Sequence, residues 1–148
     1  KDVDVTHTLW IDADTVFPAD GLTRLLSVNA PIASGIYWGR KPPYLPVVYR
    51  ERFGKYEPWE PPSGNGVHEV DGVGAGFLLV RREVYTEMTA RRLKWWERTE
   101  PGTSLSEDLA FCANARQCGF KIVVYSGVEC GHVGEVVVDR AFALRNRR

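Results

Sequence analysis

Short apolar segments alternate with helical patterns along this chain, and that alternation restricts the possible folds more than any other feature. The apolar segments lie at residues 8–11, 31–38, 76–80 and 121–125. Strands that alternate with helices are typical of an α/β structure with a parallel sheet. We therefore expect one domain over residues 1–148, with a mostly parallel sheet flanked by helices.

The strongest helical pattern covers residues 106–119. Ser106 is a suitable N-cap, and Glu107 and Asp108 favour the positive end of the helix dipole. Gly119 is suited to the position just after the last turn. Further helices are expected from Pro18 onward, over residues 81–88, and as an exposed final helix over residues 139–148.

Composition limits the classes of partner. The chain is 44% hydrophobic and 26% charged, as expected for a globular domain. It has 19 basic and 19 acidic residues, so its charge gives no reason to expect a nucleic-acid partner. We find no apolar run long enough to span a bilayer and expect no transmembrane segment. The three cysteines have no metal-type pairing, and we expect them to be reduced in a cytoplasmic protein.

Two acids stand where the first apolar segment ends. Asp12 and Asp14 are separated by Ala13, so in an extended segment both carboxylates point to one side of the backbone. Oxygen donors without cysteine suit Mg²⁺ or Mn²⁺ better than zinc. The alternative is an ordinary turn in which Asp side chains bond their own backbone.

Other candidates lie later in the chain. Glu107 and Asp108 either only stabilise the start of the helix, as acidic residues commonly do there, or one of them is a general base. His132 lies between two glycines, where a neutral imidazole can complete a metal site begun by the acids. Trp95 and Trp96 either offer their rings for stacking against a sugar or cover the hydrophobic core. Gly72, Gly74 and Gly76 stand before the apolar run that begins at Phe77, which is the wrong order for a dinucleotide fingerprint.

The order of these motifs carries a family resemblance. An Asp-x-Asp pair after a strand, then GAGFLLVRREV, then SEDLAFCANARQCGFKIVVY and finally GHVG resembles the GT-A fold glycosyltransferases, in particular the family-2-like group. The resemblance covers nearly the whole chain and implies a GT-A, Rossmann-like sheet. The family's nucleotide-binding half precedes the Asp-x-Asp strand, and we expect this chain to lack it, because only eleven residues precede Asp12.

The resemblance also implies roles on the donor side. Asp14 is the direct metal ligand, Asp12 contacts the metal or the ribose, and His132 closes the metal site. Asp12, Ala13 and Asp14 together form the donor-binding stretch. The donor is a UDP- or GDP-sugar, and the cofactor is Mn²⁺ or Mg²⁺.

On the acceptor side, the resemblance implies that Asp108 is the catalytic base, with Glu107 as its support or as the base itself. Asp71, Gly76, Trp95 and Trp96 are acceptor-site candidates.

The function implied is metal-dependent, inverting transfer of a sugar from a nucleotide-diphosphate donor to an acceptor hydroxyl. Two alternatives stay open. One is a non-catalytic carbohydrate-binding or truncated transferase module. The other is a related nucleotidyl or phosphoryl transferase, which also uses paired acids and a cation.

Overall fold

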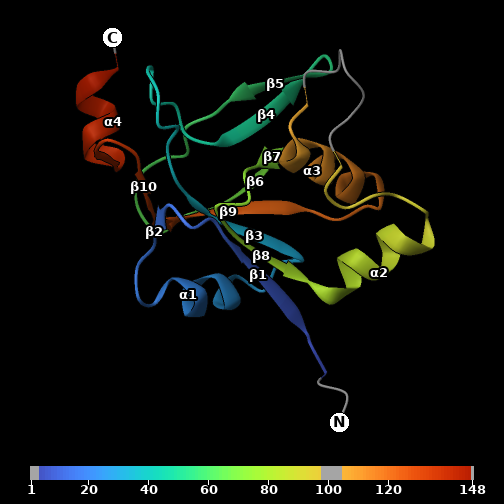
Figure 1. Cartoon of the computed structure of the whole chain (residues 1–148). Coiled ribbons are helices and arrows are strands. Elements are labelled where there is room, and N and C mark those ends of the chain that lie inside the picture. Colours follow the sequence, from blue (N-terminus) through green and yellow to red (C-terminus); the bar gives the residue numbers. More distant parts are fainter. Residues whose placement is uncertain (1–3, 98–104, 148) are drawn as a thin grey trace.

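The computed structural model describes residues 4–97 and 105–147, and its centre is a five-stranded sheet (Figure 1). The strands lie in the order β1 (His7–Ile11), β8 (Phe77–Arg81), β3 (Ile32–Ile36), β9 (Ile122–Glu129) and β6 (Val67–Val70). Each expected apolar segment became one of these strands. The sheet is therefore built from the parts of the chain that the alternation predicted, with β6 added at one edge.

The expectation of a mostly parallel sheet is wrong. Only β3 and β9 pair in parallel, whereas β1–β8, β8–β3 and β9–β6 are antiparallel. The reason is that β8 lies between β1 and β3 and runs against both. Strands β1, β3 and β9 still point in one direction, so their carboxyl ends lie at the same edge of the sheet.

Two small sheets extend this edge. One consists of β11 (Val137–Val138), β10 (Gly131–Val133) and β2 (Thr15–Val16), and the other of β5 (Lys55–Pro58), β4 (Val48–Arg52) and β7 (Gly72–Val73). In the first, β10 pairs antiparallel with β2. That pairing joins the last part of the chain to the segment directly after β1.

Helices cover both faces of the large sheet. The helix α1 (Gly21–Val28) packs below β3 and β9 in the view of Figure 1, while α2 (Arg82–Ala90) and α3 (Glu107–Gln117) lie on the opposite side. The alternation of side chains along β8 matches this arrangement. Phe77 and Leu79 belong to the cluster with α1, whereas Leu78 and Val80 belong to the cluster with α2 and α3.

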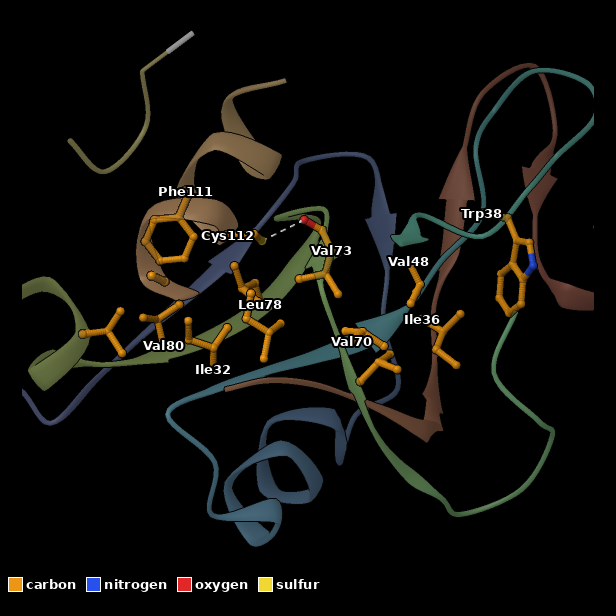
Figure 2. Close-up of a cluster of buried hydrophobic side chains, with 14 of the residues drawn as sticks. Ile32, Ile36, Trp38, Val48, Val70, Val73, Leu78, Val80, Phe111 and Cys112 are labelled. Carbon is orange, nitrogen blue, oxygen red and sulfur yellow. Dashed lines mark hydrogen bonds between the residues drawn. The ribbon is translucent and has the colours of Figure 1, made fainter. Parts of the chain in front are cut away.

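The larger core lies between the sheet and α3. Figure 2 shows Phe111 and Cys112 of α3 above Leu78 and Val80 of β8, with the thiol of Cys112 donating to the carbonyl oxygen of Val73 at 3.6 Å. Burial of the Cys112 thiol raises its pKa to about 12, so the thiol stays protonated. This helix is therefore fixed firmly to the sheet.

The ends of α3 follow the sequence prediction. The Ser106 hydroxyl accepts a hydrogen bond from the backbone N–H of Leu109 at 3.3 Å. Gly119 follows the helix with φ +89°, a conformation that a side chain would strain. The start of α1 was predicted wrongly: the carbonyl of Pro18 accepts from Gly21 N–H in a turn, and the helix begins at Gly21.

The final helix, α4 (Arg140–Asn146), is exposed over most of its residues, as expected, but is anchored on one side. Ala143 is fully buried, and the Asp139 carboxylate caps the helix by accepting from Phe142 N–H at 2.7 Å. Arg140 pairs with Glu129 at 2.8 Å and lies over the ring of Trp38. These contacts anchor α4 at the edge where β10 lies.

Two compositional predictions can be compared with the described residues. Within residues 4–97 and 105–147, no helix combines the length and the apolar character needed to cross a membrane. All three cysteines carry free thiols, as expected.

Candidate functional site

The candidate site lies at the edge of the sheet where β1, β3 and β9 end. Asp12 follows β1, and its backbone N–H donates to the carbonyl of Gly76 at 3.1 Å, just before β8 begins. Tyr37 follows β3 directly, and β10 follows β9. Ligand sites in open α/β sheets occur at such an edge.

Asp14 and His132 are brought together by the pairing of β2 with β10. His132 stands opposite Thr15 in the ladder, and the backbone N–H of Val133 donates to the carbonyl of Asp14 at 2.8 Å. As a result, Nε2 of His132 lies 3.5 Å from Oδ1 of Asp14. The imidazole is largely buried, with 11% of its side chain exposed, and the carboxylate is one-third exposed.

The orientation of the imidazole is set by a backbone carbonyl. Nδ1 of His132 lies 2.8 Å from the carbonyl oxygen of Trp38, which can only accept, so Nδ1 carries a hydrogen. In the neutral ring, the lone pair of Nε2 then faces the Asp14 carboxylate. Either a proton on Nε2 or a bound cation satisfies both of these acceptors. A metal-binding histidine commonly has its other nitrogen held in this way.

The distance between these two atoms fits a shared divalent cation. Atoms that each bind Mg²⁺ at about 2.1 Å can be separated by at most about 4.2 Å, and the 3.5 Å separation lies within that limit. Among the described residues, no three His, Cys, Asp or Glu side chains gather closely enough to hold a metal. Asp12 therefore does not join Asp14 and His132 in one group, and the protein offers two side chains instead of the expected three.

The segment around Asp12 and Asp14 is also a turn. Thr15 N–H donates to the carbonyl of Asp12 at 3.0 Å. The turn and the metal interpretations are thus compatible, because the turn uses backbone atoms and leaves the carboxylates for other partners.

Asp108 stands in the first turn of α3, close to the same edge. Burial raises the pKa of its carboxyl from 3.8 to about 6, opposed by a hydrogen bond from the backbone of Ala75. The negative charges of Glu107 and Asp12 raise this pKa further. A carboxyl with a pKa near 6 is suited to accept a proton near neutral pH.

Tyr37 is a central residue of the site that the sequence analysis did not identify. Its hydroxyl accepts from the backbone N–H of Gly76 at 3.1 Å, and its ring meets that of His132 edge-on at 5.3 Å. Burial, with contributions from the charges of Asp108 and Asp12, raises its pKa far above the ordinary value, so the phenol is neutral. Tyr37 thus connects the histidine with the Asp108 side of the edge. Its place at the end of an apolar segment was the available signal.

The glycines before β8 make room for Tyr37. A Cβ on Gly74 would lie 1.9 Å from the Tyr37 hydroxyl oxygen and 2.8 Å from Cγ1 of Val47. A Cβ on Gly76 would lie 2.7 Å from the Tyr37 ring. The small residues therefore allow the backbone to approach the Tyr37 ring closely.

We expect Gly74→Ala to lower the free energy of unfolding by about 1–3 kcal/mol, because the added methyl group overpacks the site. Urea denaturation measures this. The control is Gly39→Ala, whose Cβ would lie 3.6 Å from the carbonyl of Leu45, an ordinary contact. Combining Gly74→Ala with Tyr37→Phe should recover part of the loss, and equal losses in the single and double variants would contradict this explanation.

The acceptor-side candidates have different environments. The carboxylate of Asp71 pairs with Arg116 at 2.9 Å and accepts from Glu51 N–H at 2.8 Å, so it ties α3 to β4. Trp96 stacks on Phe111 at 4.2 Å and caps the core, whereas Trp95 is 42% exposed beside Tyr85. Of the two tryptophans, Trp95 has the more accessible ring.

Two further side chains belong to this edge. Arg40 donates to Oδ2 of Asp14 at 2.7 Å. The hydroxyl of Thr15 is buried and has no hydrogen-bond partner in the part of the chain that the structure describes. Neither stood out in the sequence.

Comparisons with known proteins give a fold but no family. No protein-family model matches the chain, and no curated protein matches it. Among solved structures the chain is similar to A197 from STIV, with a TM-score of 0.57 and 20% identity. The match covers 88% of this chain and 59% of A197, so the chain spans about three-fifths of that protein's length.

These findings overturn the family resemblance drawn from the motif order. No family model supports membership in the family-2-like GT-A glycosyltransferases, and identity of 20% to one viral protein shows only a similar fold. The expectation of a missing nucleotide-binding half depended on membership in that family, so it has no support either. The fold that can be stated is a mixed α/β fold with a mostly antiparallel sheet.

Proposed function

We propose that this chain is a metal-dependent glycosyltransferase that moves a sugar from a nucleotide-diphosphate donor to an acceptor hydroxyl with inversion. One observation carries the proposal. A carboxylate–imidazole pair suited to a divalent cation lies at the same sheet edge as a carboxyl whose pKa is raised to about 6. Transfer from a diphosphate donor needs both a cation for the leaving group and a base for the nucleophile.

Asp14 and His132 would hold the cation, Mg²⁺ or Mn²⁺. Because the protein supplies two side chains, water and substrate oxygens would complete the coordination, as is usual for Mg²⁺ bound with phosphates. When bound, the cation supplies Lewis-acid neutralisation of the charge on the leaving diphosphate. Asp12 and Ala13, in the same turn, would face the rest of a UDP- or GDP-sugar.

Asp108 would accept the proton of the acceptor hydroxyl. In one displacement, the acceptor oxygen forms a bond to the anomeric carbon, the bond from that carbon to the diphosphate oxygen breaks, and the hydroxyl proton moves to the Asp108 carboxylate. Attack from the face opposite the leaving group inverts the anomeric centre. Glu107 supports this role, because its charge helps to keep the pKa of Asp108 raised.

The acceptor would bind on the α3 side of the edge. Gly76 lies there beside Tyr37, and the exposed ring of Trp95 offers a face for a sugar. Asp71 and Trp96 would act indirectly in this proposal, Asp71 by fixing Arg116 of α3 and Trp96 by packing on Phe111. The free thiols accord with a cytoplasmic enzyme.

Calorimetric titration of UDP- and GDP-sugars, with and without Mn²⁺, tests the proposal. We expect binding of one donor to require Mn²⁺ and to weaken at least about tenfold in Asp14→Asn, which removes one charged ligand. The matched control is Asp20→Asn, because Asp20 lies outside the site in an exposed pair with Arg24. Donor binding that persists in excess chelator would contradict the metal assignment.

The same titration separates the alternatives. A sugar-binding module would bind free oligosaccharide but neither nucleotide sugar, with or without Mn²⁺. A nucleotidyl or phosphoryl transferase would bind a nucleoside triphosphate with Mn²⁺ in preference to a nucleotide sugar. Either result would replace the proposed function.

A further inference from the structure

Arg40 occupies the carboxylate that the proposed cation needs. Its guanidinium donates to Oδ2 of Asp14 at 2.7 Å, while Oδ1 of the same carboxylate faces His132. The Arg40 side chain is 52% exposed, and its stem runs beside Gly134, where a Cβ would lie 3.7 Å from Cδ of Arg40. A positive charge therefore already sits on the outer side of Asp14.

The same short segment controls both candidate ligands. The carbonyl of Trp38 orients His132, and Arg40, two residues later, pairs with Asp14. The backbone here is anchored, because Trp38 bridges to Pro46 and Gly39 N–H donates to the carbonyl of Leu45 at 2.9 Å. The guanidinium can thus change partners by side-chain rotation alone, without disturbing the histidine.

We propose that Arg40 is the diphosphate-binding side chain of this site, held on Asp14 until a divalent cation displaces it. This inference rests on the proposed function. Cation and guanidinium compete for one carboxylate, so binding of the cation releases Arg40. The released guanidinium then lies at the rim of the cation site and pairs with the diphosphate of the donor.

The competition is weak enough to be reversed by a bound ion. An exposed ion pair changes an equilibrium by at most about fivefold, and the Arg40–Asp14 pair is exposed on its arginine side. A divalent cation bound between Asp14 and His132 carries twice the charge and satisfies both acceptors. Displacement of Arg40 is therefore favourable once the cation is present.

The chemistry of the guanidinium favours a phosphate as the new partner. Its planar fork donates two parallel hydrogen bonds to phosphate oxygens, which a lysine cannot do. In the absence of ligand, pairing with Asp14 holds the guanidinium beside the proposed cation site. Arg40 thereby makes binding sequential: the cation binds first and the diphosphate binds second.

Titration of Arg40→Gln with Mn²⁺ alone tests the competition. We expect Mn²⁺ to bind about two- to fivefold more tightly than to the unmodified chain, because the internal competitor is gone. Lys41→Gln is the control for general charge, since Lys41 is the next residue and is also exposed. Its affinity for Mn²⁺ should stay within about 1.5-fold of the unmodified chain, because an exposed charge without a direct contact is largely screened.

A second titration uses preformed Mn²⁺–pyrophosphate, which represents the diphosphate of any donor. Arg40→Gln should bind this complex at least about tenfold more weakly, and Arg40→Lys should lie between the two, because it keeps the charge without the fork. Opposite changes for the ion and for the diphosphate are the signature of the proposal. General damage to the site would weaken both.

The outcomes separate this inference from the proposed function. If the unmodified chain binds Mn²⁺ and its pyrophosphate complex but Arg40→Gln alters neither affinity, Arg40 has no such role and the proposed function stands. If Arg40→Gln weakens binding of Mn²⁺ itself, the competition is wrong. If the unmodified chain binds neither probe, the proposed function and this inference both fail.

Discussion

Asp108→Asn is expected to lower the rate of sugar transfer by about 100- to 10,000-fold, the usual contribution of a general base. The amide has nearly the same shape and can still accept from the backbone of Ala75, but it cannot take a proton. Because Asp14 and His132 are untouched, Mn²⁺-dependent donor binding should change less than threefold or so. A radiolabelled transfer assay and calorimetry measure the two quantities.

The pH dependence provides an independent check on Asp108. Its carboxyl has a pKa of about 6, so the rate should rise with pH as the base loses its proton through that region. The folded chain keeps this proton to a higher pH than the unfolded chain, whose ordinary pKa is 3.8, so folding stability falls as pH rises between these values. Asp108→Asn should therefore raise Tm at pH 8 and have little effect on it at pH 3.

Glu107→Gln is the matched control for Asp108→Asn, because it removes the neighbouring charge in the same helical turn. Its rate should fall less than that of Asp108→Asn, with the pH midpoint moved to lower values, since the Glu107 charge helps to raise the pKa of Asp108. A larger loss in Glu107→Gln than in Asp108→Asn would make Glu107 the base.

Phe111→Ala should lower the free energy of unfolding by about 3–5 kcal/mol, which is a large part of the total stability of such a domain. Phe111 is fully buried, stacks on Trp96 at 4.2 Å and lies against Tyr85, so its removal leaves a cavity lined by rings. It is also on the same helix as Asp108. Guanidinium denaturation measures the change.

Phe53→Ala is the control for Phe111→Ala, because the chemical change is identical and the Phe53 side chain is fully exposed. We expect its effect to stay within about 0.5 kcal/mol. A similar loss for the two variants would mean that α3 is not packed as the structure has it.

The sequence predicted the elements of the fold better than their arrangement. Local patterns were sufficient for the strands and for α3, because capping by Ser106 and the turn at Gly119 depend on neighbouring residues. The direction of β8 depends on which strands flank it in space, and nothing local determines that. A strand inserted between β1 and β3 therefore turned an expected parallel sheet into a mostly antiparallel one.

For the same reason, only some of the side chains that gather at the candidate site could be selected from the sequence. Asp14, Asp108 and His132 were selected because acids and a histidine stood at strand or helix ends, and the structure brings all three to one edge. Tyr37 and Arg40 were missed, since an aromatic and an arginine after a strand are common. Their importance comes from contacts with Gly76 and Asp14, which are distant in the sequence.

The ladder between β2 and β10 has a consequence for folding. It joins Thr15 to His132, whereas the β1–β8 and β3–β8 ladders need nothing beyond residue 81. During synthesis, a chain can begin to build its sheet long before His132 has left the ribosome, but Asp14 has no histidine partner until then. Contacts of such long sequence separation form slowly. The pairing of β2 with β10 at the sheet edge can also open locally while the large sheet stays intact, so the contact between Asp14 and His132 forms late and is lost before the large sheet unfolds.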